Sequence, residues 1–230
     1  MSEHQLRVDR TARYALLGEP AGKIRELWIV CHGYRQLARY FIQRFEPLDD
    51  GTRLVAAPEA LSRFYLGDPD GSHGPRARVG GTWMTSEDRE NEITDYVNYL
   101  DLLHDRLLEP LQRKRPRVVG LGFSQGAATA ARWAMLGESR PGELVLWGDS
   151  VPRDLARESL QARAADLIIT LVSGRGDPAF PPERARKEAR KLEEHGFRVR
   201  VVTFDGGHEI GEKALLRVAS APVVQSLQLP

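Results

Sequence analysis

The fold of this chain is decided by the stretch Val118-Val119-Gly120-Leu121-Gly122-Phe123-Ser124-Gln125-Gly126. A short apolar run, typical of a buried strand, passes directly into an Ala-rich segment that is typical of a helix, and the pattern Gly-x-Ser-x-Gly stands at the junction. Small residues at 122 and 126 let neighbouring backbone pass without a Cβ clash. The stretch predicts a sharp strand–turn–helix unit that exposes the Ser124 hydroxyl. The alternative is a glycine-rich turn with an incidental serine.

Short apolar runs alternate with longer amphipathic segments along the rest of the chain. The runs expected to form buried strands are 27–31, 54–57, 118–123, 144–147, 167–172 and 199–204, with an additional edge strand within 10–17. The segments expected to form helices are 36–45, 87–108, 125–136, 153–163, 182–194 and 209–219. This alternation predicts one α/β domain over residues 1–230, with a mainly parallel sheet and helices on both faces.

The composition is that of an ordinary globular protein. The 230 residues are 41% hydrophobic and 28% charged, and the net charge of +1 argues against a dedicated nucleic-acid surface. The single cysteine, Cys31, excludes an intramolecular disulfide, and no apolar run is long enough to span a membrane. With a polar start that lacks the apolar core of a secretory signal, these features predict a cytoplasmic protein.

A serine hydroxyl needs a base, and a base needs an acid that orients it. Among six histidines, we expect His208 to be the base, because it follows the last strand-like run in a glycine-flanked loop. The others are His4, His32, His73, His104 and His195. Asp177 is the expected acid, since it lies between Ser124 and His208 and directly follows a strand-like run. Asp149 follows the preceding run and remains an alternative.

Attack on a carbonyl creates an oxyanion that two preorganised N–H groups are expected to bind. One is the backbone N–H of Gln125, the residue after the nucleophile. The other is expected from the early turn His32-Gly33-Tyr34-Arg35, where Gly33 permits a close approach and the Tyr34 N–H is the candidate donor. His32 is expected to brace this turn rather than to transfer protons.

Residues 58–89 form a long segment in which we expect a loop without regular structure. One hypothesis makes it a cap over Ser124 with Tyr65, Trp83 and Met84 as pocket walls, and the other makes these side chains anchors that hold the loop to the body. Trp147, at a strand end, has the same two interpretations. The arginines Arg35, Arg76 and Arg78 either steer an acidic substrate or are simply solvated.

Four motifs in this order resemble the phospholipase/carboxylesterase family of small α/β-hydrolases, which includes the acyl-protein thioesterases. They are Cys31-His32-Gly33-Tyr34, Leu121-Gly122-Phe123-Ser124-Gln125-Gly126, Gly174-Arg175-Gly176-Asp177 and Gly206-Gly207-His208. The resemblance implies the α/β-hydrolase fold, a triad of Ser124, Asp177 and His208, and oxyanion donors at Tyr34 and Gln125. It also implies that neither a metal nor an organic cofactor is needed.

These observations predict a serine carboxylesterase or thioesterase that hydrolyses small acyl esters through an acyl-enzyme intermediate. One alternative is a peptidase or amidase with the same triad, although no additional substrate-selecting domain is evident. Another is a binding protein that keeps the hydrolase fold without catalysis; such proteins generally lose a triad member, and this chain keeps all three. Acyl chain length, leaving group and oligomeric state do not follow from the sequence.

Overall fold

Apolar side chains point alternately to the two faces of a central sheet, and both faces are buried. Along β2 (Glu26–Cys31), Leu27 and Ile29 belong to one core cluster, whereas Trp28 and Val30 belong to the other. Because successive side chains of a strand point in opposite directions, a strand that is apolar throughout must be covered on both sides. Helices supply that cover.

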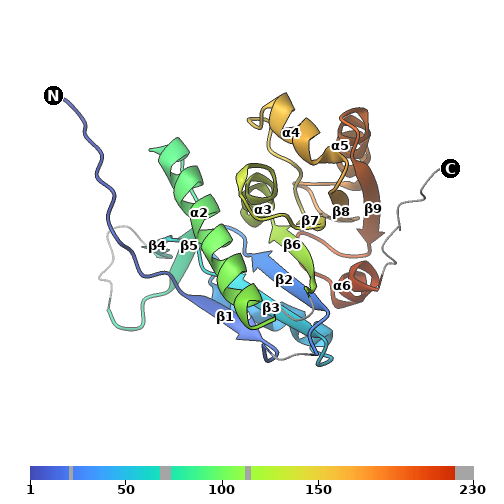
Figure 1. Ribbon diagram of the computed structural model, residues 1–230, viewed down its shortest axis with the longest axis horizontal. Coiled ribbons are helices and arrows are strands. Elements are labelled where there is room, and N and C mark those ends of the chain that lie inside the picture. Colours follow the sequence, from blue (N-terminus) through green and yellow to red (C-terminus); the bar gives the residue numbers. More distant parts are fainter. Residues whose placement is uncertain (21–22, 68–73, 112–114, 221–230) are drawn as a thin grey trace.

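The computed structural model describes residues 1–20, 23–67, 74–111 and 115–220, and its main sheet has seven strands in the order β1-β3-β2-β6-β7-β8-β9 (Figure 1). Besides β2, these strands are β1 (Tyr14–Leu17), β3 (Arg53–Pro58), β6 (Arg117–Phe123), β7 (Glu143–Trp147), β8 (Ile168–Gly174) and β9 (Arg198–Phe204). Strand β1 pairs antiparallel with β3 at one edge, and every other pairing in this sheet is parallel. The predicted α/β-hydrolase architecture is therefore confirmed.

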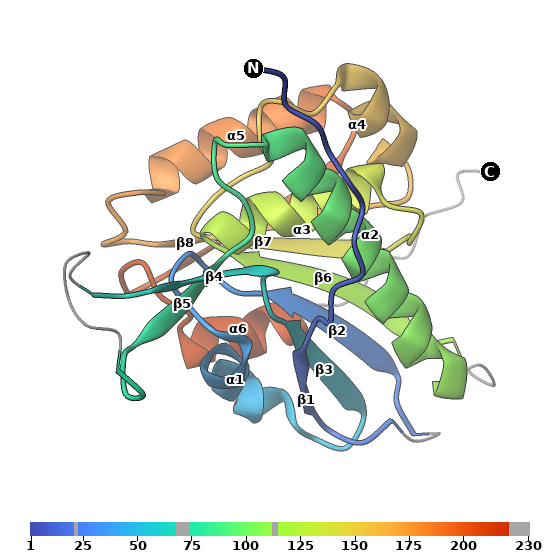
Figure 2. The same cartoon turned by 90° about the vertical axis from the view of Figure 1, so that its left-hand side faces the viewer.

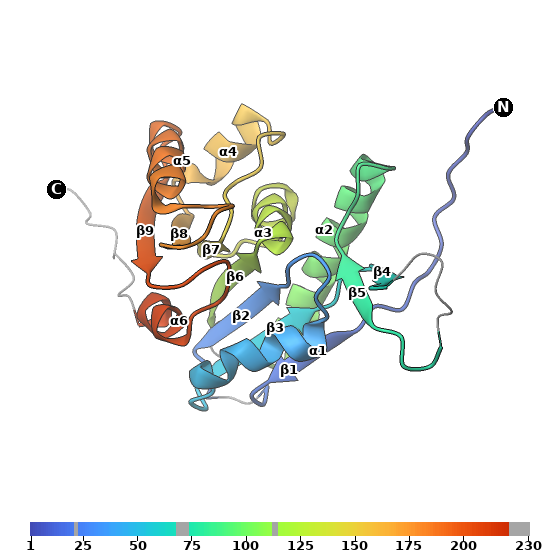
Figure 3. The same ribbon diagram turned by 180° about the vertical axis from the view of Figure 1, so that it is seen from behind.

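The helices lie in two layers, one on each face of the sheet (Figures 1 and 3). One face is covered by α2 (Arg89–Leu108), α3 (Gln125–Leu136), α4 (Arg157–Ala164) and α5 (Pro182–Glu194), and the short η2 (Glu109–Leu111) follows α2. The other face is covered by α1 (Ala38–Phe41), η1 (Ile42–Leu48) and α6 (Glu212–Ala219). Because β2, β3, β6, β7, β8 and β9 are parallel, their carboxyl ends lie at one common edge of the sheet, where ligands of such sheets bind.

Two local predictions differ from the structure. Residues 36–45 were expected to form one helix, but α1 has four residues and continues as the 3₁₀ helix η1, which contains Pro47. Proline has no N–H and clashes with the preceding turn, which disfavours a regular α-helix here. The edge strand is also shorter than 10–17, because β1 pairs with β3 only from Tyr14 onward.

Residues 58–89 are not the structureless loop that we expected. They contain β4 (Ser62–Tyr65) and β5 (Val79–Thr82), which pair antiparallel as a small second sheet; residues 68–73 of this segment lie outside the described chain. Figure 2 shows this hairpin beside the chain that leaves β2. The β4–β5 hairpin is therefore placed against the edge of the main sheet where strands β2 and β6 end.

Candidate active site

Ser124 occupies the sharp turn between β6 and α3, and its backbone is strained. Its φ is 53° and its ψ is −121°, in a region that side-chain-bearing residues rarely adopt. A Cβ atom on Gly122 would lie 2.0 Å from the Gly126 carbonyl oxygen, and one on Gly126 would lie 2.2 Å from the Cys31 carbonyl oxygen. Both positions therefore require glycine, and the turn has the geometry of a nucleophile elbow.

His208 lies in the loop after β9 and is held by Asp177, which follows β8. The Nδ1 atom of His208 is 2.7 Å from Oδ2 of Asp177. Asp177 is only 2% exposed, and its Oδ1 accepts hydrogen bonds from the backbone N–H groups of Ala179 and Phe180 at 2.8 and 3.1 Å. Because both carboxylate oxygens have donors, the Asp177 carboxylate has one orientation and holds the proton of His208 on Nδ1.

Asp149, the alternative acid, has different partners. Its Oδ1 accepts a hydrogen bond from the Ser150 N–H at 2.9 Å and lies 3.6 Å from a guanidinium nitrogen of Arg184. Burial raises the pKa of Asp149, while Arg184 and His208 act in the opposite direction. The hydrogen bond of the His208 ring goes to Asp177 and not to Asp149. The geometry thus distinguishes the expected acid, Asp177, from the alternative, Asp149, by the hydrogen bond to His208.

His208 is brought to the elbow by packing on Phe123, the residue before Ser124. The ring centroids of Phe123 and His208 are 4.9 Å apart. On another side of the imidazole, Gly148 leaves room for it, because a Cβ at 148 would lie 2.8 Å from Cε1 of His208. The Ser124 N–H donates to the Trp147 carbonyl at 2.8 Å, which ties the elbow to the strand end before Gly148. The Ser124 hydroxyl and His208 are not hydrogen-bonded in this structure, as is common before substrate binds.

The two candidate oxyanion donors are backbone N–H groups with no acceptor among the described residues. Gln125 is the first residue of α3, so its N–H has no intrahelical acceptor. Tyr34 lies in the turn after β2, where its neighbours Gly33, Arg35 and Gln36 donate their N–H groups to protein oxygens and Tyr34 does not. Unpaired N–H groups of this kind are suited to stabilise a negative oxygen.

The β4–β5 hairpin is hydrogen-bonded directly to the turn that carries Tyr34. The Arg35 N–H donates to the Gly81 carbonyl, and the Gly81 N–H donates to the Gln36 carbonyl, both at 2.9 Å. A Cβ on Gly80 would lie 2.6 Å from the Arg35 carbonyl oxygen, so glycine permits this approach. The Tyr34 ring also stacks on Phe64 of β4 at a centroid distance of 5.2 Å.

The side chain of Gln125 links the other candidate donor to the same hairpin. Its Nε2 donates to Thr82 Oγ1 and to the Met84 carbonyl, both at 3.0 Å, and its Oε1 accepts the Trp83 N–H at 3.1 Å. This glutamine was predicted only for its backbone N–H. A second unpredicted contact is that of Gln36, whose Oε1 accepts the Gly33 N–H at 2.8 Å. The sequence signal for both is weak, since an amide beside a glycine turn is common.

His32 is fully buried and braces the turn, as expected. Its Nδ1 lies 2.8 Å from the Gly33 carbonyl oxygen, and its Nε2 accepts the Ala60 N–H at 3.1 Å. Burial lowers the pKa of the His32 imidazole, which opposes a positive charge at this position. The Trp83 ring packs on it with a centroid distance of 5.1 Å. His32 is thus a neutral structural support.

The four predicted pocket side chains divide into anchors and accessible groups. Trp83 is 2% exposed and donates its indole N–H to the His32 carbonyl; Trp147 is 1% exposed and donates its indole N–H to the Glu209 carbonyl next to His208. Neither ring presents a free face to solvent, so both hold site loops in place. Met84 is half-buried and Tyr65 is 49% exposed on the hairpin.

The sequence of residues 28–219 matches the family model described as serine hydrolase (FSH1). The chain belongs to this family of serine hydrolases. The match covers the elbow, Asp177 and His208 together. No curated protein sequence matches the chain.

Solved structures similar to this serine hydrolase agree with the resemblance seen in its motifs. They include a carboxylesterase from Mesorhizobium loti (TM-score 0.67, 17% identity, 93% of this chain and 95% of that one). Another is Zea mays acyl-protein thioesterase 2 (TM-score 0.64, 19% identity, 90% of this chain and 96% of that one). A third is a phospholipase/carboxylesterase from Dyadobacter fermentans (TM-score 0.60, 16% identity, 92% of this chain and 96% of that one). At these identities the likeness establishes a shared fold. Within the described residues, no helix of this serine hydrolase combines the length and apolarity that a membrane crossing needs.

Proposed function

We propose that this serine hydrolase cleaves small acyl esters or thioesters, with Ser124, His208 and Asp177 as the catalytic residues. The single observation that carries the proposal is the 2.7 Å contact between His208 Nδ1 and the buried Asp177 carboxylate, beside a serine strained at φ 53°. A buried, doubly anchored carboxylate on a histidine is what a general base needs to stay in one tautomer.

In the proposed mechanism, Asp177 keeps the proton on Nδ1 of His208, so that Nε2 is free to accept the Ser124 proton. The Ser124 oxygen attacks the acyl carbon, and the resulting oxyanion is bound by the N–H groups of Tyr34 and Gln125. His208 then gives its proton to the leaving alcohol or thiol. Water, deprotonated by the same imidazole, attacks the acyl-enzyme, which releases the carboxylic acid and restores the Ser124 hydroxyl.

We further propose that, within 58–89, the β4–β5 hairpin and the residues 83–84 that follow it form a fixed wall beside Ser124. The support is the set of hydrogen bonds that joins Gly81 to the 35–36 backbone and Gln125 to residues 82–84. Tyr65 and Met84 are the accessible members of this wall, while Trp83 and Trp147 contribute by holding it and the His208 loop in place. We also propose a cytoplasmic location, in keeping with a buried Cys31 that forms no disulfide.

The test is hydrolysis of p-nitrophenyl esters from acetate to octanoate by the wild type and by Ser124→Ala, together with labelling by a fluorophosphonate. We expect ester turnover and labelling by the wild type and neither by Ser124→Ala. Wild-type protein that is folded but neither hydrolyses any ester nor reacts with the probe would refute the proposal.

A further inference from the structure

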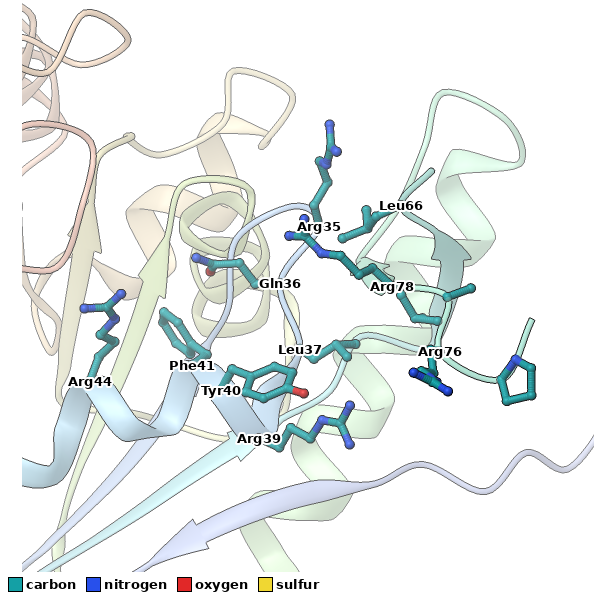
Figure 4. Close-up of a pocket in the computed structure, with 13 residues that line it drawn as sticks. Arg35, Gln36, Leu37, Arg39, Tyr40, Phe41, Arg44, Leu66, Arg76 and Arg78 are labelled. Carbon is teal, nitrogen blue, oxygen red and sulfur yellow. The ribbon is translucent and has the colours of Figure 1, made fainter. Parts of the chain in front are cut away.

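A cavity of about 600 Å³ lies on the other side of the Tyr34 turn, between that turn, the α1–η1 segment and the chain entering β5 (Figure 4). Its size is that of a small-molecule site. Its lining contains five arginines and neither an aspartate nor a glutamate among the described residues. The arginines are Arg35, Arg39, Arg44, Arg76 and Arg78.

These positive charges are not explained by the general composition. The chain has 33 basic and 32 acidic residues, so five arginines with no acid among the described residues of one lining are a local concentration of charge. None of the ion pairs within the described chain includes any of the five. A concave surface with one sign of charge attracts anions, and arginine binds phosphate oxygens in a bidentate manner.

Arg35 connects this cavity to the site of acyl transfer. It follows Tyr34 directly, and its backbone has a φ of 68°, a conformation that favours glycine or asparagine. Strain of this kind persists where the surrounding structure imposes it, and here Gly80 and Gly81 pack on the Arg35 backbone. In Figure 4 the Arg35 and Arg78 side chains extend from the turn and from the chain entering β5 on the same side of the cavity.

Apart from Gln36, the rest of the described lining is apolar and partly aromatic. Tyr40 is 58% exposed, and the Arg39 guanidinium lies 4.6 Å from the centre of its ring. Leu66 and Val79 extend this apolar surface. An exposed aromatic ring beside several arginines suits a ligand that carries phosphates together with a flat heterocycle.

We propose that this cavity binds the phosphate-bearing nucleotide portion of a thiol leaving group, so that the preferred substrates are acyl thioesters of a nucleotide-bearing thiol. The inference rests on the proposed ester and thioester hydrolysis and specifies its substrate class. The acyl carbonyl lies at Ser124, and the leaving group extends past the Tyr34 turn to the arginines.

The first test compares acyl-coenzyme A with the same acyl group on N-acetylcysteamine, which lacks phosphates. At low salt we expect kcat/KM to be at least about tenfold higher for the coenzyme A thioester, with the preference decreasing as salt screens the arginines. The double variant Arg76→Gln/Arg78→Gln loses most of this preference and keeps the wild-type rate with p-nitrophenyl esters. The control Arg157→Gln/Arg190→Gln removes the same charge from exposed positions on α4 and α5 and keeps the preference.

The second test measures binding without turnover. Adenosine 3′,5′-bisphosphate is titrated into Ser124→Ala by calorimetry, with and without the Arg76→Gln/Arg78→Gln changes, and inorganic phosphate is titrated in parallel. We expect the bisphosphate to bind more tightly than inorganic phosphate, and its affinity to decrease at least about fivefold on loss of the two arginines.

The outcomes separate the two proposals. Hydrolysis of p-nitrophenyl esters with equal kcat/KM for both thioesters overturns this inference and leaves the proposed esterase function intact. Inorganic phosphate that binds as tightly as the bisphosphate shows a site for free anions and overturns the substrate assignment. Bisphosphate binding in a protein that hydrolyses no ester overturns the assignment to a leaving group, and the esterase proposal fails with it.

Discussion

Gly148 and His208 are packed so closely that no side chain fits between them. A Cβ at position 148 would lie 2.8 Å from Cε1 and 3.1 Å from Nδ1 of the imidazole, and the φ of Gly148 is 72°. The glycine therefore shapes the space in which the His208 ring is held against Phe123 and Asp177.

Replacing Gly148 with alanine is expected to displace the His208 ring and to lower kcat/KM for p-nitrophenyl esters by about 10²-fold, since small misplacements of catalytic groups have effects of this size. Gly51→Ala is the matched control, because Gly51 also has a positive φ of 75° but nothing within 4 Å of a Cβ. Both variants lose about 1 kcal/mol or more of stability from backbone strain. Equal activity in the two variants would refute this role of Gly148.

The two aspartates near His208 are expected to differ strongly in their effect on the reaction. Asp177→Asn removes the carboxylate that orients His208 and is expected to lower kcat roughly 10³–10⁴-fold. Asp149→Asn, whose carboxylate does not bond to the imidazole, is expected to lower kcat less than about tenfold. Steady-state kinetics of both variants, with circular dichroism to verify folding, decides between them; a larger loss in Asp149→Asn would reverse the assignment.

Thr82 is expected to act as a positioning residue through Gln125. Its Oγ1 accepts from Gln125 Nε2 at 3.0 Å and donates to the Met84 carbonyl at 2.9 Å. Thr82→Val keeps the shape and removes both hydrogen bonds, each worth about 1 kcal/mol. We expect a several-fold lower kcat with little change in KM, and recovery in Thr82→Ser, which restores the hydroxyl. A loss of stability without any change in kcat, or no recovery by serine, would mean that the contact is only structural.

His32 is expected to make stability depend on pH. Burial lowers its pKa from the usual 6.5, so the unfolded chain binds a proton at this residue at a higher pH than the folded protein does. The contribution of this pKa shift to the free energy of unfolding is at its maximum above about pH 6.5. It decreases as the pH falls below that value, by at most about 1.4 kcal/mol per pH unit.

Urea denaturation between pH 7.5 and 5 tests this, with His32→Asn as the variant that cannot titrate and that keeps an N–H donor near the Gly33 carbonyl. The wild type is expected to lose more stability than the variant over this interval. An NMR titration of the wild-type imidazoles gives an independent result, and a His32 pKa at or above 6.5 would contradict the prediction.

The parts of the fold that were predictable are those with strong local constraints. The segment around Ser124 gave both the strand end at Phe123 and the helix over 125–136, because the glycines and the apolar periodicity act within a few residues. The sequence favoured Asp177 over Asp149 without excluding Asp149, because both follow parallel strands that end at the same edge. Only the direction of the His208 hydrogen bond distinguishes them.

The β4–β5 hairpin was not predictable, because its strands lack strong local constraints. Each strand has four residues, β5 contains Gly80 and Gly81, and neither has a clear alternating pattern. Their stabilising partners are the backbone at 35–36 and the Gln125 side chain, which are far away in sequence. The buried, hydrogen-bonded positions of Trp83 and Trp147 follow from the same long-range packing, so a sequence pattern leaves their role ambiguous.

Strand β5 contacts two parts of the molecule. Its residue Gly81 is hydrogen-bonded to the turn that carries Tyr34, and the residues just before the strand include Arg76 and Arg78, which line the cavity. A shift of this strand would therefore move the arginines of the cavity and the candidate oxyanion donor Tyr34 at the same time. Inserting or deleting residues here in order to change the preferred leaving group would therefore alter turnover as well. Exchanging the side chains at 76 and 78 on an unchanged backbone would change only the leaving-group preference.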